Sequence, residues 1–432
     1  MNSSVRIFCG WLSLVGVILL GGCDMPDAPQ FRLNMVQMVS DATPTPPAYQ
    51  EQIANVLDGM FGTPDEPFAL PETGLDLRKL QMAAGPAWTD DKGANFGLYR
   101  KHCVHCHGVT GDGRGPTALF LNPYPRDYRA GVYKFKSTYN PARPTDEDLH
   151  RVLINGIPGT AMPSFSLSPQ AELESLAEYV KYLSIRGQME IALANYAFND
   201  LGEEETVDDK GEPVLDDEGE PVMRLIPLDP ASDEEQRTVI TELLAEIMDP
   251  WNTVNEQIIV PEEGAIPVDN RPAEDVAASV AKGRELFYGI RANCMKCHGP
   301  TGLGDGQQDD FDNWNKAHKQ FLDSLASSSE EDELTGTRDS VAASLYPIRN
   351  AIPRNLRKGI YRGGHRRIDV FWRIYAGIAG TPMPGSGPAS PGAQGTLTEE
   401  EIWSIVDYVL SLPYETPSRP LEALPTNLEL VN

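Results

Sequence analysis

Cysteine and basic residues are both scarce in this sequence. Its 432 residues include six cysteines, and 36 Lys and Arg stand against 63 Asp and Glu, which gives a formal net charge of −27. A chain this acidic is poorly suited to bind nucleic-acid phosphates. The sequence also lacks a recognisable Ser/His/Asp arrangement and a glycine-rich phosphate-binding loop. These absences argue against a serine hydrolase, a nucleotide-binding protein or a DNA-binding protein.

The N-terminus carries an apolar run. Met1 to Arg6 ends in a positive charge, IFCGWLSLVGVILL follows, and GGC precedes the polar DMPDAPQ. This pattern is typical of an export signal, and the run is shorter than the about 20 apolar residues of a spanning helix. Leu20-Gly21-Gly22-Cys23 resembles the lipobox of bacterial lipoproteins. The resemblance implies that residues 1–22 are removed and that Cys23 carries lipid on the periplasmic side of a bacterial membrane. An ordinary signal peptide cut nearby is the alternative.

The remaining cysteines lie in two identical frames. Cys9 leaves with the signal, and the last four cysteines fall in CVHCH at 103–107 and CMKCH at 294–298. C-x-x-C-H is the attachment signature of c-type haem, in which two thiols bond the porphyrin and the histidine binds iron. A redox disulfide and half of a zinc site are the competing interpretations. Two covalently bound haems are therefore predicted, held by two sets of residues: Cys103, Cys106 and His107, then Cys294, Cys297 and His298.

A matching loop follows each frame. NGIPGTAMPSF lies downstream of the first and AGIAGTPMPGS downstream of the second, so both contain G-x-x-G-T-x-M-P. Thioether sulfur favours reduced iron, and His/Met ligation raises the reduction potential of a haem. We predict Met162 and Met383 as sixth ligands. Core packing is the alternative role for a methionine, and the other candidate ligands are His150, His318 and His365.

The similarity of the two halves extends beyond these ligands. PRDYRAGVY at 125–133 parallels PRNLRKGIY at 353–361, and DEDLHRVLINGIPGTAMP aligns without gaps with RIDVFWRIYAGIAGTPMP. Each half ends in a predicted amphipathic helix that begins with acidic residues. This order resembles class I cytochrome c over residues 90–187 and 276–413. The resemblance implies a mainly α fold in which the first and last helices cross and the haem fills the core of each domain.

Arginines recur at matching positions of the P-R-x-x-R repeat. Arg126 corresponds to Arg354, and Arg129 corresponds to Arg357. The planar guanidinium pairs well with carboxylates, so Arg126 and Arg354, or else Arg129 and Arg357, are predicted to bind haem propionates. A solvated surface position is the alternative.

The remaining segments differ in composition. Residues 188–275 carry 25 acidic and 4 basic side chains, a net charge of −21, and contain DDKGEPV and DDEGEPV. This acidic linker is predicted to be partly structured, with tight turns and a helix in SDEEQRTVITELLAEIMDPWNTVNEQI. The Pro-rich residues 23–89 are predicted to form a membrane-proximal spacer. The second domain has an insertion at about 307–346 and a basic stretch at 349–367, and 414–432 form a C-terminal tail.

These features predict a membrane-anchored, periplasmic dihaem cytochrome that transfers single electrons between redox protein partners. Two alternatives remain open. One is a haem enzyme with an open axial site that acts on peroxide or a sulfur species. The other is a fixed cytochrome subunit of a respiratory or dehydrogenase complex. No catalytic residue is predicted.

Overall fold

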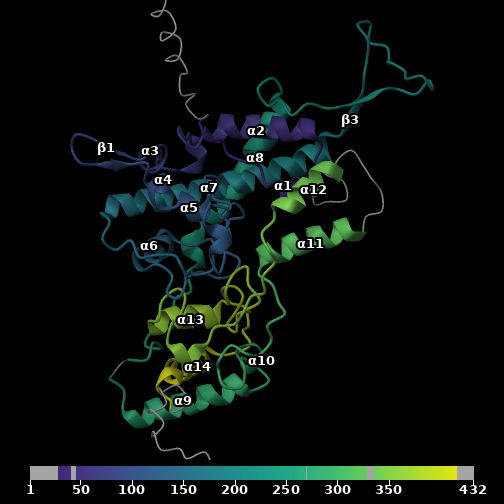
Figure 1. Ribbon diagram of the computed structural model, residues 1–432. Helices are drawn as coiled ribbons and strands as arrows, with labels where there is room; N and C mark the ends of the chain where they lie inside the picture. The colour runs from purple at the N-terminus through teal and green to yellow at the C-terminus, as the bar shows by residue number, and fades with distance from the viewer. Residues whose placement is uncertain (1–27, 40–44, 269, 328–334, 416–432) are drawn as a thin grey trace, which may run out of the picture.

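The computed structural model describes residues 28–39, 45–268, 270–327 and 335–415. The predicted signal segment, Cys23 and nearly all of the predicted tail lie outside these residues. The described chain forms two lobes (Figure 1). The upper lobe is built around α7 (Gln170–Tyr196), and the lower lobe around α9 (Ala273–Tyr288) and α14 (Glu399–Ser411). Among the described helices, none combines the length and the apolar character needed to cross a membrane.

Helices dominate both lobes, which confirms the predicted mainly α fold. The strands in the described residues form two short antiparallel pairs. They are β1 (Trp88–Thr89) with β2 (Asn95–Phe96), and β3 (Glu203–Glu205) with β4 (Met223–Leu225). The other elements of the upper lobe are α4 (Leu98–His102), α5 (Val104–His107), η2 (Ala118–Phe120) and α6 (Asp146–Asn155).

Residues that the sequence predicts as a spacer are folded against α7. The segment includes α1 (Met35–Val39), α2 (Pro47–Phe61), η1 (Pro71–Thr73) and α3 (Leu77–Ala83). Tyr49, Ile53, Leu57 and Phe61 are almost fully buried and recur every four residues, so they form one helix face. Pro47 opens α2 at a position where its missing N–H costs no hydrogen bond. Pro71 likewise opens η1, so two of the prolines stand at helix starts within a folded segment.

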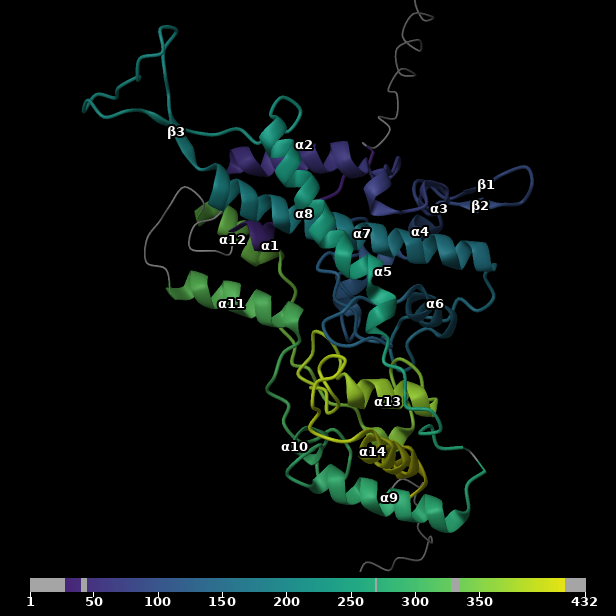
Figure 2. The ribbon, with the colours of Figure 1, turned by 180° about the vertical axis from the view of Figure 1, so that it is seen from behind.

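The lower lobe contains the crossing of first and last helices expected for a cytochrome c domain. A Cβ at Gly283 of α9 would lie 1.9 Å from the Ser404 carbonyl oxygen of α14, so this approach requires glycine. Phe287 and Tyr408 pack edge to face at 5.3 Å beside the crossing. α13 (Arg367–Tyr375) lies between α14 and the upper lobe (Figure 2). Shorter elements are α10 (Met295–His298), η5 (Leu356–Lys358) and η6 (Leu412–Tyr414).

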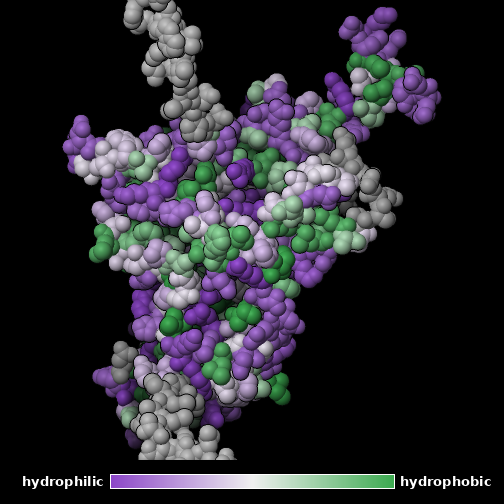
Figure 3. Space-filling view, in the orientation of Figure 1, coloured by the Kyte–Doolittle hydropathy of each residue, from purple (hydrophilic) through white to green (hydrophobic). Residues whose placement is uncertain are grey.

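The acidic linker is partly structured, as predicted. It contains the end of α7, the π turn η3 (Ala197–Leu201), the β3/β4 pair, α8 (Glu234–Asn252) and η4 (Val254–Gln257). Beyond β3 the chain projects from the upper lobe as an arm whose surface is largely hydrophilic (Figure 3). The Asp208 and Asp216 carboxylates each accept two backbone N–H bonds, which form the tight turns expected at D-K-G and D-E-G.

The insertion in the second half packs on the first. Its helices, α11 (Asn313–Ser327) and α12 (Thr335–Ser344), lie beside the upper lobe in both ribbon views. Phe321 and Val341 are buried in the same apolar cluster as Leu176 and Tyr182 of α7. The insertion therefore links the two halves through a shared core.

This packing predicts that Phe321→Ala destabilises the upper lobe. Loss of a buried phenylalanine costs about 3–5 kcal/mol through lost burial and the cavity that remains. Guanidinium unfolding of the holoprotein, followed by circular dichroism, should show a lower midpoint. Phe120→Ala is the matched control, because Phe120 is 82% exposed and its loss should cost within about 0.5 kcal/mol. Equal midpoints for the two variants would show that the insertion does not stabilise this lobe.

Candidate haem-binding sites

The first C-x-x-C-H frame forms one tight helical turn, which consists of Cys103 and α5 and directly follows α4. The backbone N–H groups of Cys106 and His107 both donate to the Cys103 carbonyl, at 3.1 and 2.8 Å. This turn places Cys103, Cys106 and His107 on one face, as residues three and four apart share a helix face. Both cysteines are free thiols, and burial raises the pKa of Cys103 to about 12. The pair is therefore available, in the reduced form, to bond a porphyrin.

His107 is held as a neutral imidazole with a fixed orientation. Its Nδ1 lies 3.1 Å from the Arg126 carbonyl oxygen, to which it donates, and the Tyr128 hydroxyl lies 3.1 Å from Nε2. Burial lowers the pKa of His107 to about 4. The lone pair therefore sits on Nε2, which is the form that a metal-binding histidine requires, with its other nitrogen fixed by a carbonyl.

The second frame repeats this arrangement. The backbone N–H of His298 donates to the Cys294 carbonyl at 2.9 Å, and His298 Nδ1 lies 3.3 Å from the Arg354 carbonyl oxygen. Burial lowers the pKa of His298 and raises the pKa of Cys294 to about 11, and Cys297 is also a free thiol. Leu356 occupies the position that corresponds to Tyr128. Both frames thus present the same donor set to a haem.

The two methionine loops have the same internal hydrogen bonds. In the first, Ile157 N–H donates to the Met162 carbonyl at 3.1 Å, and Met162 N–H donates to Thr160 Oγ1 at 3.1 Å. The corresponding bonds of Met383 are 3.1 and 3.3 Å. Both side chains are partly buried and pack against the core cluster of their own lobe. Their role as iron ligands stays a prediction.

The first methionine loop lies close to the helix that leads into the first frame. Phe165, three residues after Met162, packs edge to face on His102 at 5.7 Å. His102 directly precedes Cys103. The loop and the cysteine frame are therefore neighbours in the upper lobe, as a shared haem site requires.

The two predicted pairs of propionate-binding arginines differ in their hydrogen-bond partners. Arg129 forms a two-bond ion pair with Asp127 at 3.0 and 2.7 Å, and Arg357 bonds the Thr301 carbonyl and the Glu415 carboxylate. In contrast, Arg126 Nη2 and Arg354 Nε are buried without a hydrogen-bond partner in the described residues. Arg354 also donates from Nη2 to the Ile360 carbonyl at 3.3 Å. A buried guanidinium nitrogen without a partner favours an anionic acceptor beside it. Of the two alternatives, the structure favours Arg126 and Arg354 as the residues for propionates.

Of the other candidate histidines, only His318 lies near the first site, where Asp127 and Arg129 are among its charged neighbours. His365 is exposed, His150 is partly buried on α6, and His318 is buried on α11, where its ring lies 4.4 Å from Trp314. Burial lowers the pKa of His318 to about 4. Within the described residues, no cluster of three or more His, Cys, Asp and Glu could hold a metal ion directly.

Sequence reasoning missed two further cations beside these sites. Lys134 and Arg362 each follow the last residue of the P-R-x-x-R-x-G-[V/I]-Y repeat, and burial lowers their pKa values to about 8 and about 10. Extending the repeat by one residue would have found them. The donor sets, the neutral histidines and the buried guanidinium nitrogens without partners on Arg126, Arg354 and Arg362 together fit a haem with its two propionates in each domain.

Comparisons with known families agree with this geometry. Residues 91–180 match the family described as cytochrome C oxidase, cbb3-type, subunit III, and residues 280–413 match the family described as cytochrome c. No curated protein matches the chain. Among solved structures, a chain of the reducing HAO-like protein complex of Kuenenia stuttgartiensis is 21% identical, with a TM-score of 0.42. That match covers 73% of this chain and 94% of the other.

This protein therefore contains two cytochrome c domains, one centred in each lobe. Domains of this family carry haem c, with its iron, in covalent linkage, and two domains hold two haems. The predicted cofactors and the predicted dihaem cytochrome c family are thereby confirmed.

Replacing one cysteine pair should remove one haem and leave the other. Cys103→Ser with Cys106→Ser, and separately Cys294→Ser with Cys297→Ser, should each halve the haem content, because each pair serves one porphyrin. Mass spectrometry of the intact chain and of its peptides measures this. Retention of both covalent haems in either double variant would contradict the assignment.

Proposed function

We propose that this protein passes single electrons between redox partners on the periplasmic side of a bacterial membrane, to which lipid on Cys23 anchors it. The observation that carries the proposal is the repeated site. Each domain presents a neutral histidine fixed by a carbonyl, and a methionine loop with the same hydrogen bonds. Two sites of one kind in one chain suit electron transfer in series.

Bound haem supplies a one-electron couple between Fe(II) and Fe(III). The chain's own residues hold that group in place. Cys103 and Cys106 would bond the first porphyrin, and Cys294 and Cys297 the second. His107 and His298 would supply one nitrogen ligand to each iron, and Met162 and Met383 are proposed to supply the sulfur ligands. Because hydrogen bonds fix each imidazole and each loop, little needs to move when the charge on the iron changes.

Redox protein partners, free or within a respiratory or dehydrogenase complex, are proposed to dock close to the haem frames. Exposed apolar side chains near each frame support this. Phe120 is 82% exposed on η2, whose start bonds back to the His105 carbonyl, and Ile290 is 96% exposed four residues before Cys294. Apolar groups in a polar surrounding are common in protein interfaces.

Carbon monoxide tests whether both sixth positions are filled. The reduced wild-type protein should show no spectral change with carbon monoxide, because methionine occupies each iron. Met162→Ala and Met383→Ala should each make one haem reactive. Met223→Ala is the control, since Met223 is 48% exposed on β4. A spectral change in the wild-type protein would refute the filled sites and favour a haem enzyme with an open position.

Lipid on Cys23 is tested by replacing that residue. Cys23→Ser should release the protein from the membrane fraction into the soluble periplasmic fraction, since the acyl chains provide the anchor. Mass spectrometry of the wild-type N-terminal peptide should find Cys23 as the first residue, with the added mass of lipid. A mature wild-type chain that begins elsewhere would contradict the anchor and leave the haem sites unaffected.

A further inference from the structure

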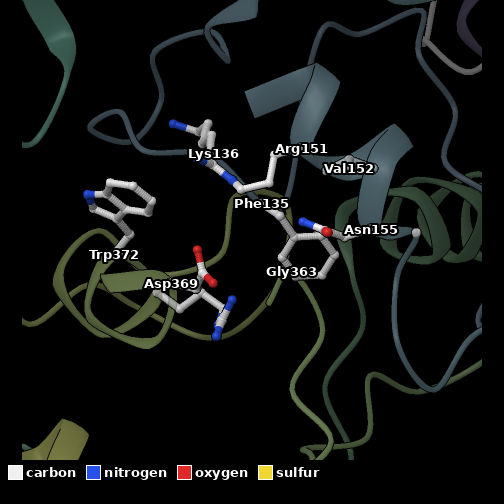
Figure 4. Close-up of a pocket in the computed structure, with 10 residues that line it drawn as sticks. Phe135, Lys136, Arg151, Val152, Asn155, Gly363, Asp369 and Trp372 are labelled. Atoms are coloured by element: carbon white, nitrogen blue, oxygen red, sulfur yellow. The ribbon is translucent and has the colours of Figure 1, made fainter. Parts of the chain in front are cut away.

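The two domains meet through equivalent elements. α6 and α13 occupy matching places in the two halves and face one another across a small cavity (Figure 4). The Arg151 guanidinium of α6 lies 5.0 Å from the ring centre of Trp372 in α13, and these residues occupy matching positions in the gapless alignment. Phe135 likewise contacts its counterpart Gly363. When equivalent residues of two similar domains contact each other, the domains are related by an approximate two-fold rotation. The axis of that rotation passes close to these contacts.

The methionine loops cross this interface reciprocally. A Cβ at Gly159, in the loop of Met162, would lie 2.8 Å from Arg354 Nη2 and 3.2 Å from Ile360 of the other domain. A Cβ at the equivalent Gly380, in the loop of Met383, would lie 3.1 Å from Val132 and 3.6 Å from Arg126 Nη1. Each loop therefore packs against the arginine of the opposite domain.

Each of these arginines thus serves two domains. The carbonyl of Arg126 accepts from His107 of its own domain, while its guanidinium reaches the loop of Met383. Arg354 does the same for His298 and the loop of Met162. The backbone carbonyl of each arginine therefore holds the histidine of its own domain, while its positively charged guanidinium lies beside the methionine loop of the other domain.

The two pairs of cations at the interface differ in whether an acidic side chain neutralises them. Lys134 accompanies Arg126, and Asp312 from the insertion lies 3.2 Å from Lys134. Arg362 occupies the place of Lys134 beside Arg354, and the charge of Arg354 adds to burial in lowering the pKa of Arg362. Within the residues that the structure describes, no acidic side chain pairs with Arg354 or Arg362. The insertion supplies its acid to one of the two cation pairs.

We infer that Arg126 and Arg354 each tune the haem of the opposite domain, so that Arg354 and Arg362 raise the potential of the first haem. Arg126 and Lys134 then raise the potential of the second haem, and Asp312 offsets part of their effect. The ferric haem carries one positive charge more than the ferrous haem, so a nearby buried cation disfavours oxidation. The inference rests on the two haems, and its test also rests on Met162 and Met383 as their proposed ligands. It does not depend on the membrane anchor or the partners.

Redox titration of the purified dihaem protein tests this inference. Each of the two reduction potentials, called a wave here, is first assigned to its haem. Met162→His and Met383→His change one axial ligand each, which should lower the potential of only one haem. Arg354→Gln should then lower the reduction potential of the haem that Met162→His identifies. Arg126→Gln should lower the reduction potential of the haem that Met383→His identifies. A tenfold change in the ferric-to-ferrous ratio is expected, which corresponds to about 59 mV for one electron.

The matched control removes the same charge from the surface. Arg78 has a side chain that is 91% exposed, so Arg78→Gln should leave both waves in place. Movement of only the wave of the variant's own domain would overturn the inference, as would no movement in either arginine variant. Because the two arginines are equivalent, either variant alone decides the question if the other fails to mature.

Asp312 provides an independent measurement with the opposite sign. Asp312→Asn should raise the potential of the second haem and leave the first unchanged, because it removes the negative charge beside Lys134. Asp323→Asn in the same insertion is the control, since Asp323 is largely exposed and pairs with Lys319 at 2.7 Å. A rise in the first haem, or equal effects of the two variants, would contradict the inference.

Discussion

The hydrogen bond from each predicted proximal histidine to a backbone carbonyl is the constraint on which the sites depend. His107 Nδ1 lies 3.1 Å from the Arg126 carbonyl, and His298 Nδ1 lies 3.3 Å from that of Arg354. A buried imidazole that donates from Nδ1 stays neutral and presents the Nε2 lone pair. The acceptor in both cases is the backbone carbonyl of an arginine whose side chain extends to the methionine loop of the other domain. Histidine orientation and domain packing are therefore coupled through one residue.

The duplication explains the interface, and the insertion explains its asymmetry. Two copies of one domain meet through the same surface, so the contact of Arg354 with Gly159 repeats as that of Arg126 with Gly380. The second copy carries α11 and α12, which bury Phe321 in the apolar core of the upper lobe. Asp312, at the start of this insertion, adds a negative charge to one side alone. The two domains are thus joined by an interlocked interface and not only by the linker.

Local patterns in the sequence predicted the parts of the structure that depend on neighbours in the chain. The C-x-x-C-H frames, the turns at Asp208 and Asp216, and the helices α8 and α14 are of this kind. The helices of the N-terminal segment were missed because proline, which opens α2, suggested an extended chain. The basic stretch at 349–367 carried no pattern that shows which surface it contacts. Part of it lies against the first domain, where Arg349 packs 3.9 Å above the ring of Tyr124.

The sequence by itself determined the two cysteine frames, their cofactor and the repeated methionine loops, because covalent attachment requires fixed residues at fixed spacing. Only the tertiary structure decided which arginine nitrogens are buried without a hydrogen-bond partner and which domain each guanidinium reaches. Arg126 and Arg129 are alike in the sequence, yet Asp127 neutralises Arg129 while Arg126 extends to Gly380. The physical reason is that the effect of a charge depends on the groups around it in space. For Arg126 those groups include Gly380, which lies in the other half of the chain.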